Sequence, residues 1–359
     1  MVSHPVLKTP RKKVSIRDLA RELGLSDRAV SQALNPRESN VKLSPATLER
    51  VQKLASKRGY RVDTSARAMR YGRFFNIGYF EASRSVVHYP RLGAEAGVFD
   101  AASEHGYHVV LVKIPADLTN NKSALPIVFR QSHLDALVVV HQGNLPPAYA
   151  EAIDASGLPV VYLNEKRATN SVYVDDIRGA AELTTHLLDK GLRRIAFLRG
   201  NDDSMHYSLN DRQSGCTQAL AARGLKPAIL DFGAGWEPKV ESWLQTKPGI
   251  DAIFCPDDLS ALRLIRILYR LDIRVPDQLV VAGYNGDFSR EAPVAMPTMD
   301  IPFYAMARAA AGMAVRLVED KAISSLPSQV FASRLIPDVS VETASGLWRS
   351  SLLPALRLQ

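Results

Sequence analysis

The chain has 359 residues, of which 46% are hydrophobic and 23% charged; this is ordinary for a soluble protein and long enough for one small and one large domain. No apolar run is long enough to cross a bilayer, and no apolar segment follows the basic N-terminus, so we expect neither a membrane anchor nor a signal peptide. Cys216 and Cys255 lie far apart and outside any Cys/His cluster, which argues against a structural metal. We therefore expect a cytoplasmic protein with reduced thiols and no cofactor.

Charge is distributed unevenly along the chain. Residues 1–73 contain 17 Lys and Arg against 6 Asp and Glu, a net charge of +11, whereas the whole chain carries only +8. Residues 74–359 are therefore slightly acidic, with a net charge of −3. A basic N-terminal block on a larger, mildly acidic body is typical of a nucleic-acid-binding module joined to a separate globular domain.

Residues 14–35, VSIRDLARELGLSDRAVSQALN, predict two short helices joined by a tight turn. Ser15 and Asp18 form a capping signature, Gly24 stands where the first helix must end in a left-handed residue, and Ser26 can cap the second helix. The inward-facing positions are Ile16, Leu19, Ala20 and Leu23, then Ala29, Val30, Ala33 and Leu34. Helical hairpins are common, so it is the basic charge that favours a DNA-binding helix-turn-helix.

A third helix and a short connecting helix are predicted next. Ser44 can cap a helix that starts at Pro45 and ends at Gly59. Residues 63–71, DTSARAMRY, form a short amphipathic segment with two arginines, which links the basic block to the rest of the chain.

From Asn76 onward, short apolar runs alternate with helical patterns. The predicted strands are 76–80, 108–114, 134–140, 159–164, 171–175, 193–200, 227–232, 251–256 and 279–284. Such alternation predicts parallel sheets covered by helices on both faces, here divided into two lobes. We expect the chain to cross between the lobes near Leu163–Asn164, again near Asn285–Met299, and once more close to its end. Ligands of such sheets bind in the cleft beyond the carboxyl ends of the strands.

Residues 14 to 343 resemble the LacI/GalR (lactose-repressor) family of bacterial transcriptional regulators. The matching stretches are IRDLARELGLSDRAVSQALN, LSPATLERVQKLASKRGY, GYHVVLV, LDALVVV, SVYVDDIRGAAELTTHLLDKGLRRIAFLRG, NDRQSGCTQALAARGL, DAIFCPDDLSA and IRVPDQLVVAGYN. The resemblance implies an all-α helix-turn-helix DNA-binding domain (1–61), a hinge helix (62–73), an α/β periplasmic-binding-protein-like core with two Rossmann-like lobes and parallel sheets (74–345), and a tail (346–359).

The resemblance also implies which residues contact DNA. Asp27, Arg28 and Gln32 stand where the family contacts base edges; Arg28 can pair with guanine and Gln32 with adenine. Asp27 can accept from cytosine or orient Arg28, or it is simply a carboxylate favoured at a helix N-terminus. Many relatives carry arginine in place of Gln32, so we expect a different operator sequence. The positions that match phosphate contacts are Ser31, Asn35, Ser44 and Thr47, although Ser44 can also be only a helix cap.

Residues 64–71 resemble the hinge helix that enters the minor groove in the family. Met69 takes the place of a leucine wedge, next to Ala66 and Arg67, and an apolar side chain there can open a base step and bend the duplex. The alternative is that Met69 only packs against the second protomer. Val62 and Asp63 replace the Pro-Asn common in relatives, which leaves the start of the helix less rigidly set.

For the effector cleft, Arg212 matches the arginine that binds a sugar or purine, and Asp258 lies in the stretch that matches Asn-Asp-x-x-Ala. Asn164 and Asn285 stand where most sugar-binding relatives carry aspartate, so the chemistry of the site departs from a standard hexose site. The remaining candidates are Trp236 and Phe303 as stacking aromatics, Trp236 alternatively being a core residue, and Ser83, Tyr89 or Arg91 from the stretch after the first strand.

The leading hypothesis is a homodimeric DNA-binding repressor that binds a pseudo-palindromic operator and is controlled by a small effector, most simply a sugar. A transport receptor with the same core does not explain the basic helix-turn-helix. An enzyme is disfavoured because dinucleotide, P-loop and nucleophile-elbow motifs are missing from the sequence. A core that has lost its small ligand and is ligand-independent or controlled by another protein remains the alternative. Pro354 interrupts the leucines of the tail, so we expect a dimer and not a tail-linked tetramer.

Overall fold

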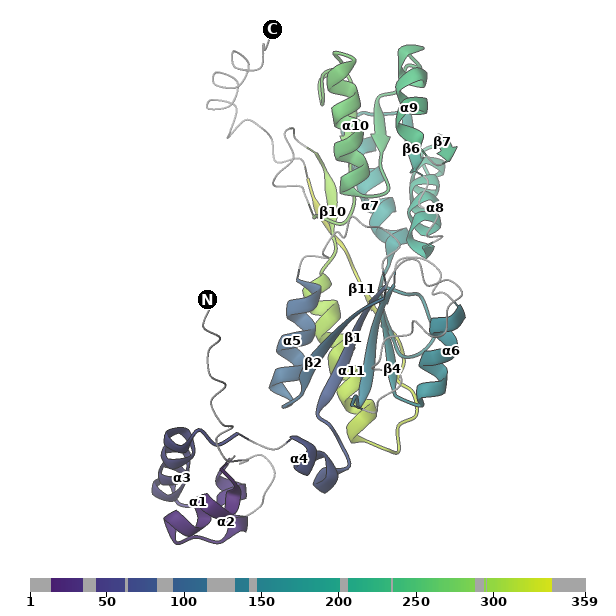
Figure 1. The fold of residues 1–359 in the computed structure, drawn as a ribbon. Coiled ribbons are helices and arrows are strands. Elements are labelled where there is room, and N and C mark those ends of the chain that lie inside the picture. Colours follow the sequence, from purple (N-terminus) through teal and green to yellow (C-terminus); the bar gives the residue numbers. More distant parts are fainter. Residues whose placement is uncertain are drawn as a thin grey trace, which may run out of the picture. The chain divides into compact units, whose positions relative to one another are not determined.

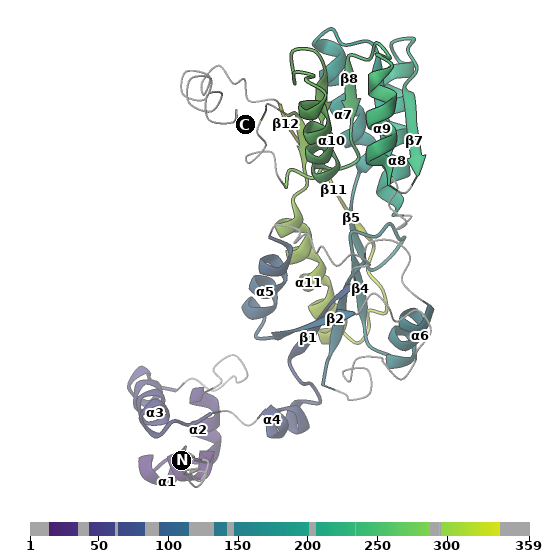
Figure 2. The same cartoon turned by 45° about the horizontal axis from the view of Figure 1, so that its top comes forward.

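The computed structural model describes residues 14–34, 43–61, 64–82, 93–114, 133–141, 147–200, 206–233, 235–287, 294 and 296–337. Contacts divide the chain into two compact units, Met1–Phe74 and Phe75–Gln359, each of which is described by itself (Figures 1 and 2). None of the described helices is long and apolar enough to cross a membrane. The finer division at residues 61, 73 and 345 stays a prediction.

The described part of the first unit contains four helices: α1 (Ile16–Leu23), α2 (Asp27–Leu34), α3 (Pro45–Arg58) and α4 (Thr64–Tyr71). Helices α1 to α3 enclose a small core in which Leu19, Val30 and Val51 are fully buried. Burying these side chains is the main force that holds three short helices together, because helices of this length are unstable alone.

The predicted helix ends are confirmed. The Ser15 hydroxyl accepts a hydrogen bond from the Asp18 N–H at 3.2 Å, and the Asp18 carboxylate accepts from the Ser15 N–H at 3.0 Å. Gly24 ends α1 with φ of 67°, a conformation that costs a non-glycine residue free energy. The Ser26 hydroxyl accepts from the Ala29 N–H at 3.2 Å. The turn between α1 and α2 is therefore fixed by local sequence.

The first lobe of the second unit contains a six-stranded sheet in the order β11-β5-β4-β3-β1-β2. Its strands are β1 (Asn76–Ala82), β2 (His108–Ile114), β3 (Ala136–His141), β4 (Val160–Leu163), β5 (Ser171–Val174) and β11 (Gln329–Phe331). Every pair in this sheet is parallel. Helices α5 (Ala94–Glu104) and α11 (Phe303–Glu319) cover one face, and α6 (Pro147–Ser156) covers the other (Figure 1).

The second lobe contains a parallel four-stranded sheet in the order β7-β6-β8-β9. Its strands are β6 (Ile195–Gly200), β7 (Ala228–Gly233), β8 (Ala252–Phe254) and β9 (Val280–Ala282). The helices of this lobe are α7 (Asp176–Asp189), α8 (Tyr207–Ala221), α9 (Trp236–Gln245) and α10 (Asp258–Arg270). All nine predicted strands are thus present, with ends that differ by a few residues.

The crossing predicted at Leu163–Asn164 is wrong. Both β4 and β5 belong to the first lobe, and Tyr162 near the end of β4 pairs with Ser171 at the start of β5. Since β5 begins beside the end of β4, it continues beyond that strand and carries the chain into α7 of the second lobe. The first crossing therefore follows β5, at Val174–Asp176.

Three short strands were not predicted. β10 (Thr298–Asp300) pairs antiparallel with β12 (Arg334–Ile336), whereas β11 joins the first sheet beside β5. The second crossing follows β10 at Asp300–Phe303, just after the stretch expected, and the third lies between β11 and β12. The second and third crossings were both expected from the sequence, near Asn285–Met299 and close to the end of the chain.

Helices α7 and α8 pack closely because Gly215 lies at their contact. A Cβ atom added at Gly215 would collide with the carbonyl oxygen of Ile177. We expect Gly215→Ala to lower the free energy of unfolding by about 1–3 kcal/mol, because backbone atoms would have to shift. Gly312→Ala in α11 is the matched control, since nothing lies within 4 Å of its added Cβ. Chemical denaturation that finds the two variants equally stable would contradict this packing.

Candidate functional site

The N-terminal half of α2 presents the residues predicted to contact bases. Asp27 and Arg28 are exposed, and Gln32, one turn later, is half-buried, as is the predicted phosphate contact Ser31. The Asp27 carboxylate lies 3.4 Å from Nε of Arg17 on α1, a partner that the sequence analysis did not single out. The only sign of this ion pair in the sequence was that Arg17 lies on the outward face of the predicted first helix. This ion pair adds a third interpretation for Asp27, which is to hold Arg17 beside α2.

Two of the other predicted phosphate contacts lie together at the start of α3. The Ser44 hydroxyl accepts from the Thr47 N–H at 3.2 Å and lies 2.8 Å from the Thr47 hydroxyl. The helix-cap role of Ser44 is therefore confirmed, and its phosphate role stays a prediction. Asn35 lies outside the described residues.

Helix α4 exposes Met69 more than any other large hydrophobic side chain among those described, at 89% of its surface. Its neighbour Ala68 is buried, and Arg67 is half-buried. Ala66 lies in the same helix. A methionine held outward on a short helix is available for a partner, whether DNA or a second protomer.

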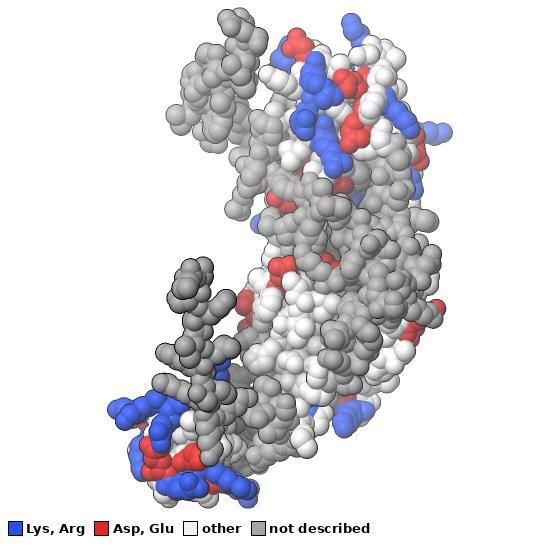
Figure 3. Space-filling view, in the orientation of Figure 1, with Lys and Arg blue, Asp and Glu red and all other residues white. Residues whose placement is uncertain are grey.

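The charge of the first unit is displayed on its surface. Lys and Arg side chains cover much of α1–α3, with acidic side chains among them (Figure 3). The ion pair of Arg58 with Glu22, at 2.6 Å, fastens α3 to α1. Arg28 on α2 and Lys53 and Lys57 on α3 are exposed. The excess positive charge is available to phosphates.

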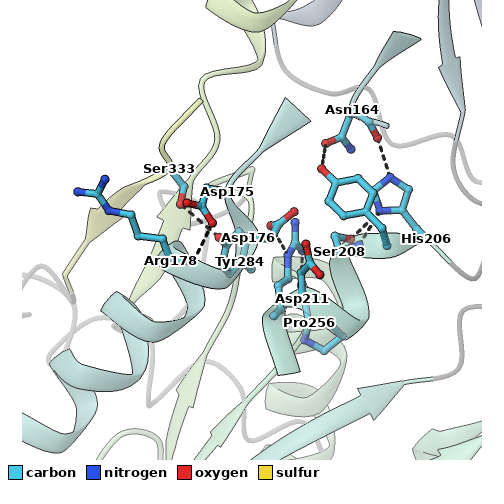
Figure 4. A network of polar contacts seen from close by, with 12 residues as sticks. Asn164, Asp175, Asp176, Arg178, His206, Ser208, Asp211, Pro256, Tyr284 and Ser333 are labelled. Atoms are coloured by element: carbon cyan, nitrogen blue, oxygen red, sulfur yellow. Dashed lines mark hydrogen bonds and ion pairs between the residues drawn. The ribbon is translucent and has the colours of Figure 1, made fainter. Parts of the chain in front are cut away.

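In the second lobe, the N-termini of three helices are capped by side chains, two by aspartates and one by a histidine. Asp175 caps α7 and Asp257 caps α10, where its carboxylate accepts from the Ser260 N–H at 2.7 Å. His206 caps α8 through Ser208. The beginnings of α7 and α8 lie together in Figure 4, with Asn164 of the first lobe beside them. The polar groups of both lobes therefore meet at the point where the chain crosses between them.

Arg212 is buried in this network. It lies in the second turn of α8, which begins at Tyr207 with His206 as its N-cap. Arg212 Nε donates to Oδ1 of Asp176 at 2.8 Å, and Nη1 donates to the carbonyl of Pro256 at 2.5 Å. The guanidinium lies 3.9 Å from the centre of the Tyr284 ring.

The carboxyl group of Asp176 is fully buried beside Arg212. Burial raises its pKa above the ordinary value, and the neighbouring guanidinium opposes that rise. Burial likewise raises the pKa of the Tyr284 hydroxyl, which lies 3.2 Å from the hydroxyl of Ser333. Asp176 was not among the predicted site residues, although it directly follows the predicted strand 171–175.

Asp258 is also buried and bonded within the protein. Its Oδ1 accepts from the Thr298 hydroxyl at 2.6 Å, and its N–H donates to the Tyr284 carbonyl at 2.8 Å. Trp236 is 4% exposed and packs in the core of the second lobe with Val240 and Leu244, and its role toward an effector stays a prediction. Phe303 is buried at the start of α11. Ser83 lies outside the described residues, as do Tyr89 and Arg91.

The backbone conformation explains why asparagine suits positions 164 and 285. Asn164 and Asn285 adopt φ of 63° and 101°, values that asparagine tolerates better than most residues. The Asn164 side chain accepts from the Tyr207 hydroxyl at 3.3 Å. Their role toward an effector stays a prediction, but the amides suit the backbone at both positions. Within the described residues, no group of His, Cys, Asp or Glu side chains could hold a metal ion.

Comparison with known proteins extends over most of the chain. A family model described as a periplasmic binding protein-like domain matches residues 184–340. The HTH-type transcriptional regulator RegA of Clostridium saccharobutylicum is 27% identical over 337 residues, which cover 90% of this chain and 97% of RegA. The curated relatives and solved structures that this chain resembles are LacI-family regulators.

Solved structures of the LacI/GalR family confirm the predicted fold class. The lac repressor dimer bound to operator and the anti-inducer ONPF has a TM-score of 0.71 at 20% identity, covering 90% of this chain and 98% of that chain. The complex of the regulator CelR with cellobiose has a TM-score of 0.63 at 23% identity, covering 91% of this chain and 99% of that chain. A helix-turn-helix unit and a two-lobed α/β core are thus the shared architecture.

Proposed function

We propose that this protein is a sequence-specific DNA-binding repressor of the LacI/GalR family, whose affinity for its operator is controlled by a small effector held in the core. The observation that carries the proposal is α2, which presents Asp27 and Arg28 to solvent from a helix-turn-helix unit with an excess of basic residues. An exposed arginine at the start of such a helix can make a bidentate contact with guanine in the major groove.

Two protomers acting together are part of the proposal. The solved lac repressor neighbour is a dimer on its operator, and a dimer of this chain would place two copies of α2 on a pseudo-palindromic site. Its place of action is then the cytoplasm, where the DNA is. No catalytic step is proposed.

A sugar or sugar derivative is the effector that we propose. Support comes from the cellobiose bound by the CelR neighbour and from the polar groups gathered where the lobes meet. The second candidate is a core that is ligand-independent or controlled by another protein. The favouring observation is that Arg212 and Asp258, the two strongest effector candidates, are already bonded to Asp176 and Thr298.

The proposal is tested by selecting binding sites with full-length protein from a pool of random duplexes and then measuring affinity at increasing salt. We expect one pseudo-palindromic site to be enriched. Because Lys and Arg displace counterions from phosphates, the logarithm of its affinity should fall with that of the salt concentration, by about 0.9 per neutralised phosphate. A pool without enrichment, or affinity insensitive to salt, would contradict the proposal.

Substituting Met69 tests the minor-groove role of α4. We expect Met69→Ala to weaken binding to the selected duplex and to reduce its bend, since an apolar wedge kinks DNA by about 20–90°. Alanine favours helices, so α4 should still form in this variant. Met69→Leu is the matched control, because it keeps a large apolar side chain at this position. Bend angles measured by fluorescence resonance energy transfer that are equal in all three proteins would rule out the wedge and leave contact with the second protomer.

A further inference from the structure

The two lobes are joined by side chains as well as by the chain crossings. The loop after β4 belongs to the first lobe, and the beginning of α8 belongs to the second. The carbonyl of Asn164 lies 2.8 Å from Nε2 of His206 (Figure 4). The side-chain oxygen of Asn164 accepts from the Tyr207 hydroxyl at 3.3 Å. One residue of the first lobe therefore contacts two successive residues of the second.

A charged pair lies beside these hydrogen bonds. Lys166 of the same loop donates to Oδ2 of Asp211 in α8 at 2.7 Å. The Lys166 ammonium also lies 6.0 Å from the centre of the Tyr207 ring. Its bond to Asp211 raises the pKa of Lys166 above the ordinary value, so the amine stays charged. The Asp211 side chain is mostly covered, so solvent screens the attraction between Lys166 and Asp211 less than it would screen a fully exposed pair.

The geometry of the loop supports its role as a fixed contact. Asn164 takes a left-handed backbone conformation directly after β4, and its N–H donates to the Val172 carbonyl of β5 at 2.7 Å. The Ser171 hydroxyl donates to the Glu165 carbonyl. On the other side, His206 caps α8, so its ring position is tied to the helix start. Both halves of the contact are thus held by their own lobes.

We propose that Asn164 and Lys166 in the first lobe and His206, Tyr207 and Asp211 in the second form an interlobe latch that sets the arrangement of the lobes and, through it, the affinity for DNA. The latch lies beside Arg212 and Asp176, so a ligand that enters there has to compete with contacts made by the chain itself. The link to DNA affinity rests on the proposed function, whereas the latch itself does not.

Distances between the lobes test the latch. Spin labels at Ala155→Cys in α6 and Gln245→Cys in α9 report on the two lobes, because both positions are exposed and the native cysteines are buried. Full-length labelled protein is mixed with excess unlabelled protein, so that pairs within one protomer dominate the pulsed-resonance signal. We expect one narrow distance distribution for the protein with its latch intact.

Two substitutions remove latch contacts with little other change. Tyr207→Phe removes only a hydroxyl, and Lys166→Met keeps the side-chain length without the charge. We expect each to raise the population of a second lobe arrangement by about twofold to fivefold, and the double substitution to raise it further. Arg194→Met is the matched control, since its partner Asp251 lies in the same lobe.

The outcomes separate the two claims. A broadened or shifted distribution in the double variant, with the Arg194→Met protein unchanged, supports the latch. Identical distributions in all proteins, or a distribution as broad before substitution as after it, would overturn it. If the distance changes while affinity for the selected duplex does not, the role in regulation is wrong although the contact is real. Failure of the unsubstituted protein to bind any duplex would instead overturn the proposed function.

Discussion

Arg212→Met is expected to destabilise the core by about 3–5 kcal/mol, because it leaves the Asp176 carboxyl buried without its charged partner. Arg212 donates to Asp176 at 2.8 Å and to the Pro256 carbonyl, and its guanidinium lies against the Tyr284 ring, so one substitution removes three contacts. For a unit of this size, we expect the melting temperature of the core to fall by roughly 10 °C. Differential scanning calorimetry of the full chain measures this transition.

A matched control and a double variant identify the cause. Arg194→Met removes an exposed ion pair from the same lobe and should cost at most about 1 kcal/mol. Asp176→Asn combined with Arg212→Met should recover part of the loss, because no charge is then buried. Equal melting temperatures for Arg212→Met and Arg194→Met would show that the buried pair contributes no special stability.

The pH dependence of the Arg212→Met protein follows from the same pair. Without the guanidinium, the largest opposition to the burial that raises the pKa of Asp176 is lost, so the folded protein holds a proton that the unfolded chain releases. Stability is then greatest below the unfolded pKa of about 3.9 and falls as pH rises toward the folded pKa. Relative to the unsubstituted protein, the variant should lose less stability at acidic than at neutral pH.

This result changes how ligand binding has to be tested. A substitution of Arg212 that abolishes binding would not show that Arg212 contacts the effector, because the core itself is weakened.

The second large effect is expected from Arg28→Ala. Loss of a bidentate arginine–guanine contact should reduce discrimination against a wrong base by about 1–3 kcal/mol, roughly fivefold to 150-fold in affinity for the selected duplex. Binding to unrelated duplexes should change little, because it depends on the total charge of the unit. Fluorescence anisotropy with the selected duplex and with singly substituted duplexes measures the difference.

Lys57→Ala serves as the control for charge alone. Lys57 is exposed in the last turn of α3, and losing it should weaken all duplexes to a similar extent. If Arg28→Ala also weakened every duplex equally, Arg28 would be a phosphate contact and base recognition would lie elsewhere on α2.

The first unit was predictable from sequence because its structure is decided locally. Ser15, Gly24 and Ser44 fix the ends of helices through bonds to residues three or four positions away. The strands of the core were predictable for a similar reason, since apolar runs such as 134–140 are long enough to stand out. Most helices and strands of the fold could therefore be predicted from local sequence patterns.

What was missed depends on contacts between distant residues. Strands β10, β11 and β12 have three residues each, and the exposed pattern of β11 gives no alternation to detect. Whether β5 stays with β4 or crosses over is decided by pairing, which the apolar run does not reveal. Asp176 and Arg212 are separated by 36 positions, so only the packing of α7 on α8 brings them together.

The candidate effector residues show the same limit. Their positions at strand and helix ends were predicted, but burial of Trp236 and the internal bonds of Arg212 and Asp258 arise from the tertiary structure. Asn164 and Asn285 illustrate a different limit, because their positive φ angles, which asparagine tolerates well, could not be foreseen from the sequence.

The most direct measurement is the affinity of full-length protein for its selected duplex, repeated with sugars, sugar acids, sugar phosphates, nucleosides and purines. A ligand-controlled repressor should bind the duplex specifically, and one class, most simply a sugar, should change that affinity by about fivefold to 150-fold. The same ligand should raise the melting temperature of the core. Specific DNA binding that no ligand class alters would contradict control by a small effector and favour a core that is ligand-independent or controlled by a protein.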